Sequence, residues 1–182
     1  MTTITPERAG MSRASFYRAA HAGEYERIAR GIYIASDAPP ADYDLIEAAT
    51  RRADATICLT SALAQYDLID TIPARLHIAI PSRSRTPATA GAIQWHQFDR
   101  ATFDLGRAPI PIAGTDLTIG RYSAERSITD AFRLRGEIGY EIARDALKEW
   151  LRRGGKPAAL LTLAEQLPRA KRPMLTALEL LS

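Results

Sequence analysis

The stretch from Gly10 to Tyr33, GMSRASFYRAAHAGEYERIARGIY, places the strongest local constraint on the fold. The Ser12 hydroxyl can accept from the unpaired N–H groups of a first helical turn, so it predicts a helix start. Gly23 predicts the end of that helix, because glycine readily adopts the left-handed conformation found there. The residues that follow favour β-structure and predict a short hairpin with Ala29-Arg30-Gly31 at its tip.

The predicted helix has one apolar and one polar face. Phe16, Ala19 and Ala20 have the i, i+3, i+4 spacing of a buried stripe. A helix followed by a basic hairpin is typical of the winged helix-turn-helix, whose helix enters the major groove and whose wing contacts phosphates. The candidate DNA-binding residues are Arg13, Ser15, Tyr17, Arg18, His21, Arg27 and Arg30. A helix that merely packs, with a solvated basic face, is the alternative interpretation.

Little sequence precedes this helix. Thr5 to Ala9 supplies at most a turn or two, with Pro6 suited to a first helical position. We therefore expect a truncated winged module, support from the rest of the chain, or a native start upstream of Met1.

Composition limits the function classes. With 46% hydrophobic and 25% charged residues the chain is an ordinary globular protein. It has no apolar run long enough for a membrane span and no export signal, so we expect a cytoplasmic protein without a membrane partner. The basic residues are 21 Arg and 3 Lys, which permits nucleic-acid binding without requiring it.

Few residues are available for metal or nucleophilic chemistry. Cys58 is the single cysteine and lies in an apolar run, so we interpret it as a core residue. The chain has one Cys and only three His, so it offers no zinc-ligand pattern, and we expect no metal and no cofactor.

The segment Ser36-Asp37-Ala38-Pro39-Pro40 predicts a domain boundary. We expect a winged module over residues 1–36 and, over residues 41–182, a mixed α/β domain with a small sheet and a helical C-terminal part, giving an α+β protein. The strands 75–80 and 92–98 are expected to pair antiparallel. The loop between them carries Arg83 and Arg85, and we expect it to be exposed and mobile.

The remaining expected elements follow from periodicity and turn residues. They are helices over 42–51, 60–66, 123–135, 140–153, 157–167 and 172–181, a buried run at 55–59, and a hairpin formed by 110–112 and 117–119. Thr60 or Ser61 is expected to cap the second of these helices, and Ser123 the third.

A search for catalytic groups assigns no catalytic residue. His96, or Ser61 with His77 or His96, could be drawn as a base or a triad, but no nucleophile elbow or oxyanion loop accompanies them. Arg126 and Asp130 have the spacing of a structural ion pair within a helix. The acidic row Glu137, Glu141 and Asp145 has basic neighbours and is interpreted as an ion-paired surface rather than a metal site.

The order of these pieces resembles the AbiEi-type antitoxins, which are transcriptional regulators of bacterial toxin–antitoxin pairs. The likeness runs from Gly10 onward, and the N-terminal helix with its hairpin resembles that family's winged helix. The other segments that carry it are Leu59–Leu63, Asp67–Pro73, Ile78–Pro81 with Arg83 and Arg85, and Glu125–Arg135.

The resemblance implies an antitoxin and autoregulatory repressor that is not an enzyme. Such a protein binds inverted repeats in its own promoter, as a homodimer if it matches their two-fold symmetry. It also counteracts a cognate nucleotidyltransferase-like toxin, directly or indirectly. The alternative is a protein-interaction module that binds the toxin without binding DNA.

Overall fold

The structure is a computed structural model that describes residues 3–38 and 42–181. Pro39 and Pro40, on which the predicted domain boundary rests, lie outside the described residues. The elements are, in order, α1 (Arg13–His21), β1 (Tyr25–Ala29), β2 (Ile32–Ala35), α2 (Tyr43–Arg51), β3 (Thr56–Ile57), α3 (Leu59–Gln65), β4 (Leu76–Pro81), β5 (Ile93–Phe98), the 3₁₀ turn η1 (Arg100–Thr102), β6 (Arg107–Pro111), β7 (Thr118–Tyr122), α4 (Ala124–Arg133), α5 (Arg135–Ile138), α6 (Tyr140–Arg152), α7 (Pro157–Gln166) and α8 (Lys171–Leu181).

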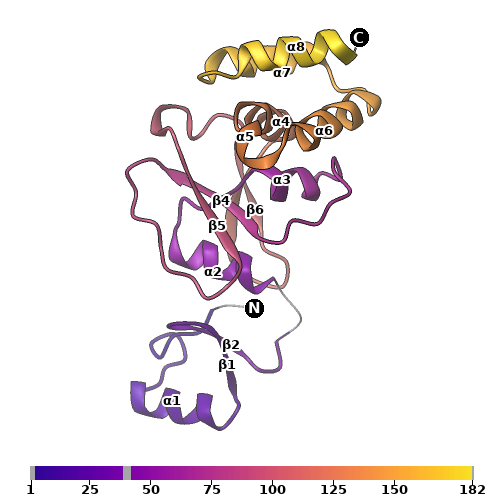
Figure 1. Ribbon diagram of the computed structural model, residues 1–182. Helices are drawn as coiled ribbons and strands as arrows, with labels where there is room; N and C mark the ends of the chain where they lie inside the picture. The colour runs from indigo at the N-terminus through magenta and orange to yellow at the C-terminus, as the bar shows by residue number, and fades with distance from the viewer. Residues whose placement is uncertain (1–2, 39–41, 182) are drawn as a thin grey trace.

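The chain is an α+β protein arranged along one long axis. Figure 1 shows α1 and the β1–β2 hairpin at one end, α2 and a mixed sheet in the middle, and the C-terminal helices at the other end. The hairpin forms a two-stranded sheet of its own, and the larger sheet has the strand order β5-β4-β3-β7-β6. Strands followed by a helical C-terminal part were predicted, and this part of the prediction is confirmed.

The short strand β3 lies at the centre of the larger sheet. It pairs antiparallel with β4 and parallel with β7. The predicted hairpin is confirmed as β6 and β7, which pair antiparallel. Strand β6 forms one edge of the sheet and contains Pro109 and Pro111, residues that have no backbone N–H to donate.

The predicted antiparallel pairing of the two strands before and after the Arg83–Arg85 loop is wrong. Strands β4 and β5 are parallel, with Leu76 opposite Ile93. A parallel partner requires the chain to return to the start of β4, and the loop is long enough to do so without a helix. Its far end is held at α2, where Ala90 N and Gly91 N donate to the Glu47 carboxylate.

Of the helix caps predicted at Ser123 and at Thr60 or Ser61, the first is confirmed and the second is wrong. The Ser123 hydroxyl accepts from Arg126 N at 3.2 Å and begins α4, as predicted. In α3, however, Cys58 occupies the cap position and Thr60 and Ser61 lie inside the helix. The reason is that α3 starts directly after β3, so the hydroxyl groups already belong to the first helical turn.

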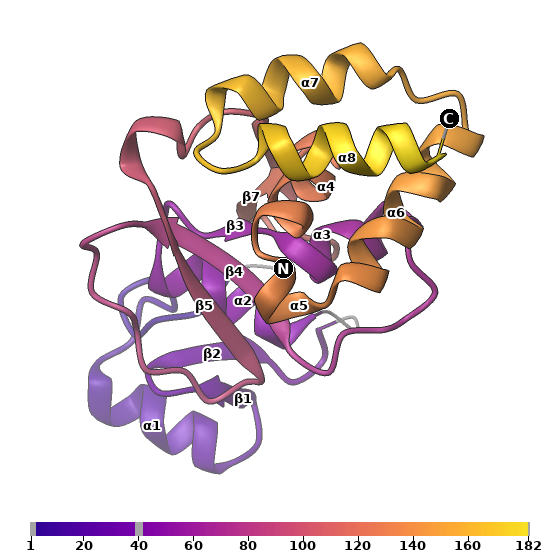
Figure 2. The same ribbon diagram turned by 45° about the horizontal axis from the view of Figure 1, so that its top comes forward.

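The C-terminal helices enclose the largest apolar cluster. Ile128 and Phe132 of α4 are buried with Leu147 of α6, Leu160 of α7 and Met174 of α8. Figure 2 shows α7 and α8 lying side by side above α4 and α6. The helix predicted over 140–153 is confirmed and is amphipathic: Ala146, Leu147 and Trp150 are buried with Ala143, and Ile142 is half-buried against the same cluster.

A buried ion pair joins this helical layer to the sheet. Arg126 and Asp130 are both 0% exposed, and Arg126 Nε donates to Asp130 Oδ2 at 2.8 Å. Arg126 Nη1 donates to the carbonyls of Thr102 and Leu105, each at 2.8 Å, and the guanidinium lies 4.4 Å from the centre of the Tyr122 ring. The predicted structural role of this pair is confirmed.

We predict that Arg126→Ala lowers the free energy of unfolding by about 3 kcal/mol or more, because it leaves the buried Asp130 carboxylate with Arg133 as its remaining partner and removes two hydrogen bonds to loop carbonyls. Arg152→Ala is the control, since Arg152 pairs with Glu149 on the surface and its loss should cost less than about 1 kcal/mol. Urea unfolding measures both. Equal losses of unfolding free energy in the two variants would contradict the structural role of the Arg126–Asp130 pair.

Candidate nucleic-acid interface

The helix α1 forms as its caps predict. Ser15 N donates to the Ser12 hydroxyl at 3.2 Å at the start of the helix. At its end, Glu24 N donates to the Ala19 carbonyl, while Gly23 has φ of +88°, a left-handed value that favours glycine. Phe16 and Ala19 are buried and Ala20 is half-buried, so the predicted apolar stripe faces inward.

Three aromatic rings hold α1 against the hairpin. The Phe16 ring is 0% exposed and stacks on Tyr25 at a centroid distance of 4.9 Å. It meets Tyr33 edge-on at 5.1 Å, and Ile4 forms a β-bridge to Tyr33. Residues 6–10 form turns and one helix precedes the hairpin within the described residues. The aromatic contacts thus fix the orientation of α1 in a very small module.

The opposite face of α1 presents most of the predicted site residues to solvent. Arg13, Tyr17 and His21 are exposed and follow each other at intervals of four, so they form one row along the helix. Arg18 is exposed beside this row, and its Nη2 donates to the Ser15 hydroxyl at 3.3 Å. Within the described chain, neither Arg13 nor Arg18 has an ion-pair partner. This face is therefore a row of free donors around a half-exposed tyrosine.

Ser15 differs from the other candidates on α1. It is half-buried, and its hydroxyl accepts from Ser12 Oγ at 3.0 Å as well as from Arg18. The structure therefore places Ser15 between the cap and Arg18, where it orients a basic side chain.

The hairpin carries the two remaining candidates. Arg30 and Gly31 form its tip, as predicted, and Gly31 has φ of +78°. Arg27 is exposed and its Nε donates to the Ala29 carbonyl at 3.3 Å, beside a register shift in the strand pairing. The Arg30 side chain is exposed. Arg30 lies beside Arg51 of α2, so the tip of the hairpin is not free.

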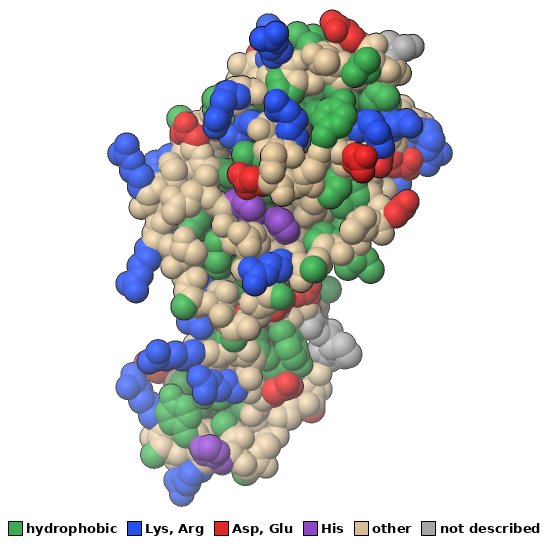
Figure 3. All heavy atoms as spheres, in the orientation of Figure 1, with side chains coloured by type: hydrophobic (Ala, Val, Ile, Leu, Met, Phe, Trp, Pro, Cys, Tyr) green, Lys and Arg blue, Asp and Glu red, His purple; other side chains and the backbone are tan. Residues whose placement is uncertain are grey.

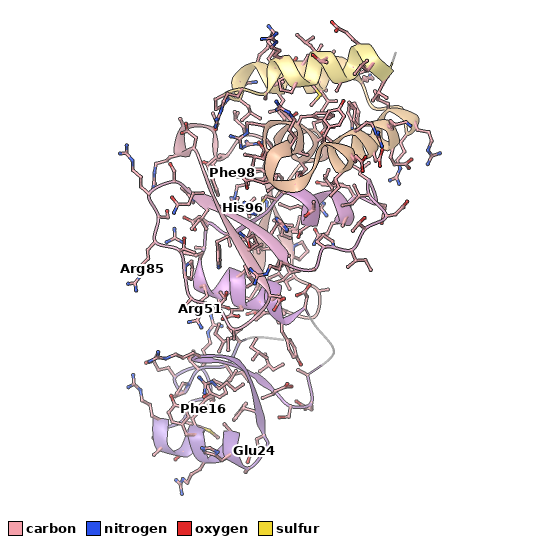
Figure 4. All side chains as sticks on the ribbon, in the orientation of Figure 1. Phe16, Glu24, Arg51, Arg85, His96 and Phe98 are labelled. Carbon is pink, nitrogen blue, oxygen red and sulfur yellow. The ribbon has the colours of Figure 1, made fainter. Side chains whose placement is uncertain are left out.

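The tip of the hairpin lies against α2. Ala29 and Ile32 are buried in one cluster with Leu45 and Ala48 of that helix. Arg51 Nη2 donates to the Arg30 carbonyl at 3.1 Å, and the Tyr43 hydroxyl donates to Glu26 Oε2 at 3.2 Å. Figure 4 shows Arg51 on α2, next to the hairpin. The module is thus tied to the larger domain by packing and by hydrogen bonds.

Sequence reasoning missed Glu47 and Arg51 as organising residues. Glu47 is 2% exposed and accepts from Ala90 N, Gly91 N and Arg51 Nη2. The available signal was an acidic residue inside the apolar run Leu45–Ala48, four residues before an arginine. A buried carboxylate needs such partners, because an unpaired one would be strongly unfavourable.

The structure also locates the groups considered for catalysis. Ser61 Oγ accepts from His77 N at 2.8 Å and donates to the Arg75 carbonyl, so its hydroxyl is engaged by backbone. His77 Nδ1 lies 2.9 Å from His96 Nε2, and Glu137 Oε2 lies 3.9 Å from His96 Nδ1. Burial lowers the pKa of His96, and burial together with His96 lowers the pKa of His77 to about 4. Both imidazoles are therefore neutral at neutral pH.

Cys58 is fully buried, and burial raises the pKa of its thiol, in keeping with its predicted place in the core. Among the described residues, no group of three or more acidic, His or Cys side chains is arranged to hold a metal ion. No helix in residues 3–38 and 42–181 has the length and apolar character needed to cross a membrane.

We predict that His77→Gln reduces the loss of stability on acidification. The folded protein holds this imidazole with a pKa of about 4, below its ordinary value of 6.5, so the unfolded chain takes up the proton first. Stability should therefore fall as pH decreases from 6.5 to 4 in the wild type, by no more than about 2 kcal/mol from this group, since it is half-exposed. Thermal unfolding across this range should give a flatter profile for His77→Gln, and an unchanged one for the exposed His21→Gln.

One comparison with known proteins concerns the fold of the whole chain, and another concerns the family of its N-terminal part. A search of curated proteins finds no match. Among solved structures, the chain is similar to the RV2827C protein from Mycobacterium tuberculosis, with a TM-score of 0.67 and 18% identity, over 98% of this chain and 72% of that chain. At this level of identity the likeness concerns the fold alone.

The family comparison falls on the N-terminal module. Residues 4–35 match the family model described as transcriptional regulator, AbiEi antitoxin. The matched range contains α1, the whole hairpin and all seven candidate DNA-binding residues. The resemblance to the AbiEi antitoxin family of transcriptional regulators is thereby confirmed for residues 4–35 of this chain.

Proposed function

We propose that the protein is an antitoxin and autoregulatory transcriptional repressor that binds inverted repeats in its own promoter. The N-terminal module acts as a truncated winged helix-turn-helix, with α1 in the major groove and the hairpin against the phosphate backbone. The observation that carries this proposal is the exposed row of Arg13, Tyr17 and His21 within the residues that match the regulator family. Duplex DNA is a polyanion, and these unpaired donors suit it.

The second half of the proposed function belongs to residues 41–182. In this proposal the larger domain counteracts a cognate nucleotidyltransferase-like toxin and supports dimerisation on the inverted repeats, while α1 remains free for DNA. No catalytic residue is assigned to the domain. The protein acts through binding rather than through a reaction.

A protein-interaction module without DNA binding is the second candidate. Ile72 favours it, because this apolar side chain is 90% exposed and lines two hollows beside α6. The two candidates differ in their response to salt. DNA binding through phosphate contacts weakens steeply as salt rises, whereas an apolar protein contact does not.

We predict that Arg13→Ala and Arg18→Ala each weaken binding to promoter DNA by about 5- to 150-fold, the loss expected for one phosphate or base contact of 1–3 kcal/mol. The measurement is a gel-shift titration with a duplex from the region upstream of the gene. Arg144→Ala serves as the control, because Arg144 is paired with Asp145 on α6, far along the chain from α1. Retention of full affinity by both N-terminal variants, with unchanged melting curves, would contradict the proposed interface.

We further predict that the double variant Arg13→Ala/Arg18→Ala still protects cells from the toxin. Both side chains are exposed, and neither makes a hydrogen bond or ion pair to residues 42–181, so their loss should leave that domain intact. Growth during co-expression of the toxin provides the measurement. If the double variant is folded and the cells stop growing, the assignment of antitoxin activity to residues 41–182 is wrong.

A further inference from the structure

A basic hollow lies where the N-terminal module meets the larger domain. It has a volume of about 460 Å³ and is lined by Arg30 of the hairpin tip, Arg51 of α2 and the loop Arg85–Ala90. Figure 3 shows that Lys and Arg side chains gather over the N-terminal module and continue along the same edge of the domain. Figure 4 places Arg85 and Arg51 on this edge, with Arg85 pointing away from the sheet.

The positive charge of this hollow is only partly neutralised. Among the described residues that line it, three are arginines and the others are uncharged. Arg85 and the Arg30 side chain are exposed, and neither guanidinium bonds to any described residue. Arg51 is shared between Glu47 and the Arg30 carbonyl, and its buried Nε has no acceptor within the described chain. The hollow thus has spare guanidinium donors from three separate segments.

The loop that carries Arg85 is held at both ends. At its start, Arg83 N donates to Gln97 Oε1 at 3.0 Å, and Gln97 Nε2 donates to the Ser84 carbonyl. At its end, Ala90 N and Gly91 N donate to Glu47, each at 2.9 Å. A Cβ at Gly91 would meet the Asp44 carboxylate, so a larger residue here would have to displace the Asp44 side chain. The loop is therefore exposed, as predicted, but it is anchored rather than free at its ends.

We infer that this hollow is a phosphate subsite, in which Arg30, Arg51 and Arg85 hold a backbone phosphate of the duplex whose bases are contacted by α1. The inference rests on the proposed function and extends it, because two of the three side chains belong to the larger domain. Glu47 sets the geometry of the subsite: it positions Arg51 and anchors the loop that bears Arg85.

A phosphate fits this arrangement better than other anions do. Arginine presents a planar fork of donors that matches phosphate oxygens, and the free guanidinium groups of Arg30 and Arg85 offer two such forks, to which Arg51 adds charge and an unpaired Nε. The hairpin lies between α1 and α2, which bears Arg51 (Figure 1), so we expect one duplex to reach both α1 and the hollow. The duplex would then cover the junction of the two domains as well as the N-terminal module.

The test measures the salt dependence of DNA binding by the full-length protein. The probe is a fluorescent duplex from the region upstream of the gene, titrated between 50 and 200 mM salt, and a duplex of unrelated sequence and equal length is titrated in parallel. Arg85→Gln should lower the slope of log K against log salt by about 0.9 and weaken binding about tenfold at 50 mM salt. Both duplexes should lose affinity alike, because phosphate contacts carry no sequence information.

Two further variants isolate the subsite. Arg85→Lys retains the charge and should keep the wild-type slope. Arg172→Gln removes the same charge from exposed α8 and should also keep it, since that helix lies at the opposite end of the molecule. If Arg172→Gln lowers the slope as much as Arg85→Gln, the effect is one of net charge and the subsite is refuted.

The outcomes distinguish this inference from the proposed function. An unchanged slope for Arg85→Gln, together with lost binding for Arg13→Ala, overturns the phosphate subsite and leaves the DNA-binding proposal standing. Failure of the wild-type protein to bind either duplex at 50 mM salt overturns both. A lowered slope for Arg85→Gln alone among these three variants supports the subsite.

Discussion

The larger domain depends on one ion pair that is completely removed from water. Arg126 and Asp130 lie on α4 at the point where the 3₁₀ turn, strand β7 and the helical layer meet, and Arg126 also satisfies two loop carbonyls. Taking both charges out of water is costly, and the cost is offset by the bonds that Arg126 Nε and Nη1 and Arg133 make, although Arg126 Nη2 finds no acceptor among the described residues. The pair thereby ties α4 to the 3₁₀ turn and to the loop that follows it.

A second buried carboxylate connects the fold to the proposed function. Glu47 holds the end of the long loop and, through Arg51, the hairpin tip, so one side chain of α2 fixes the relative position of two surface segments. The α1 helix itself is oriented by the aromatic contacts of Phe16. The surface proposed to meet DNA thus rests on two small, separate clusters, one apolar and one polar.

Local signals predicted much of this structure from sequence. Caps such as Ser12 and Ser123, the glycine after α1 and the periodicity of α6 act within a few residues, so helices and tight hairpins could be placed, and the exposed face of α1 could be listed. The direction of the pairing between β4 and β5 could not be predicted, because the loop between them is long enough for either direction and its end bonds to Glu47, 43 residues from Ala90. The basic hollow could not be predicted either, because its three arginines come from segments that are far apart in the sequence and meet only in the folded chain.

The prolines of β6 restrict how copies of the protein can associate. Pro109 and Pro111 remove two hydrogen-bond donors from an edge strand, so that edge is a poor template for an incoming strand. A continuous sheet across two subunits, built through β6, is accordingly disfavoured. Self-assembly on a palindromic site would instead use side-chain surfaces or the opposite edge strand β5, and accidental fibril-like stacking along β6 is suppressed.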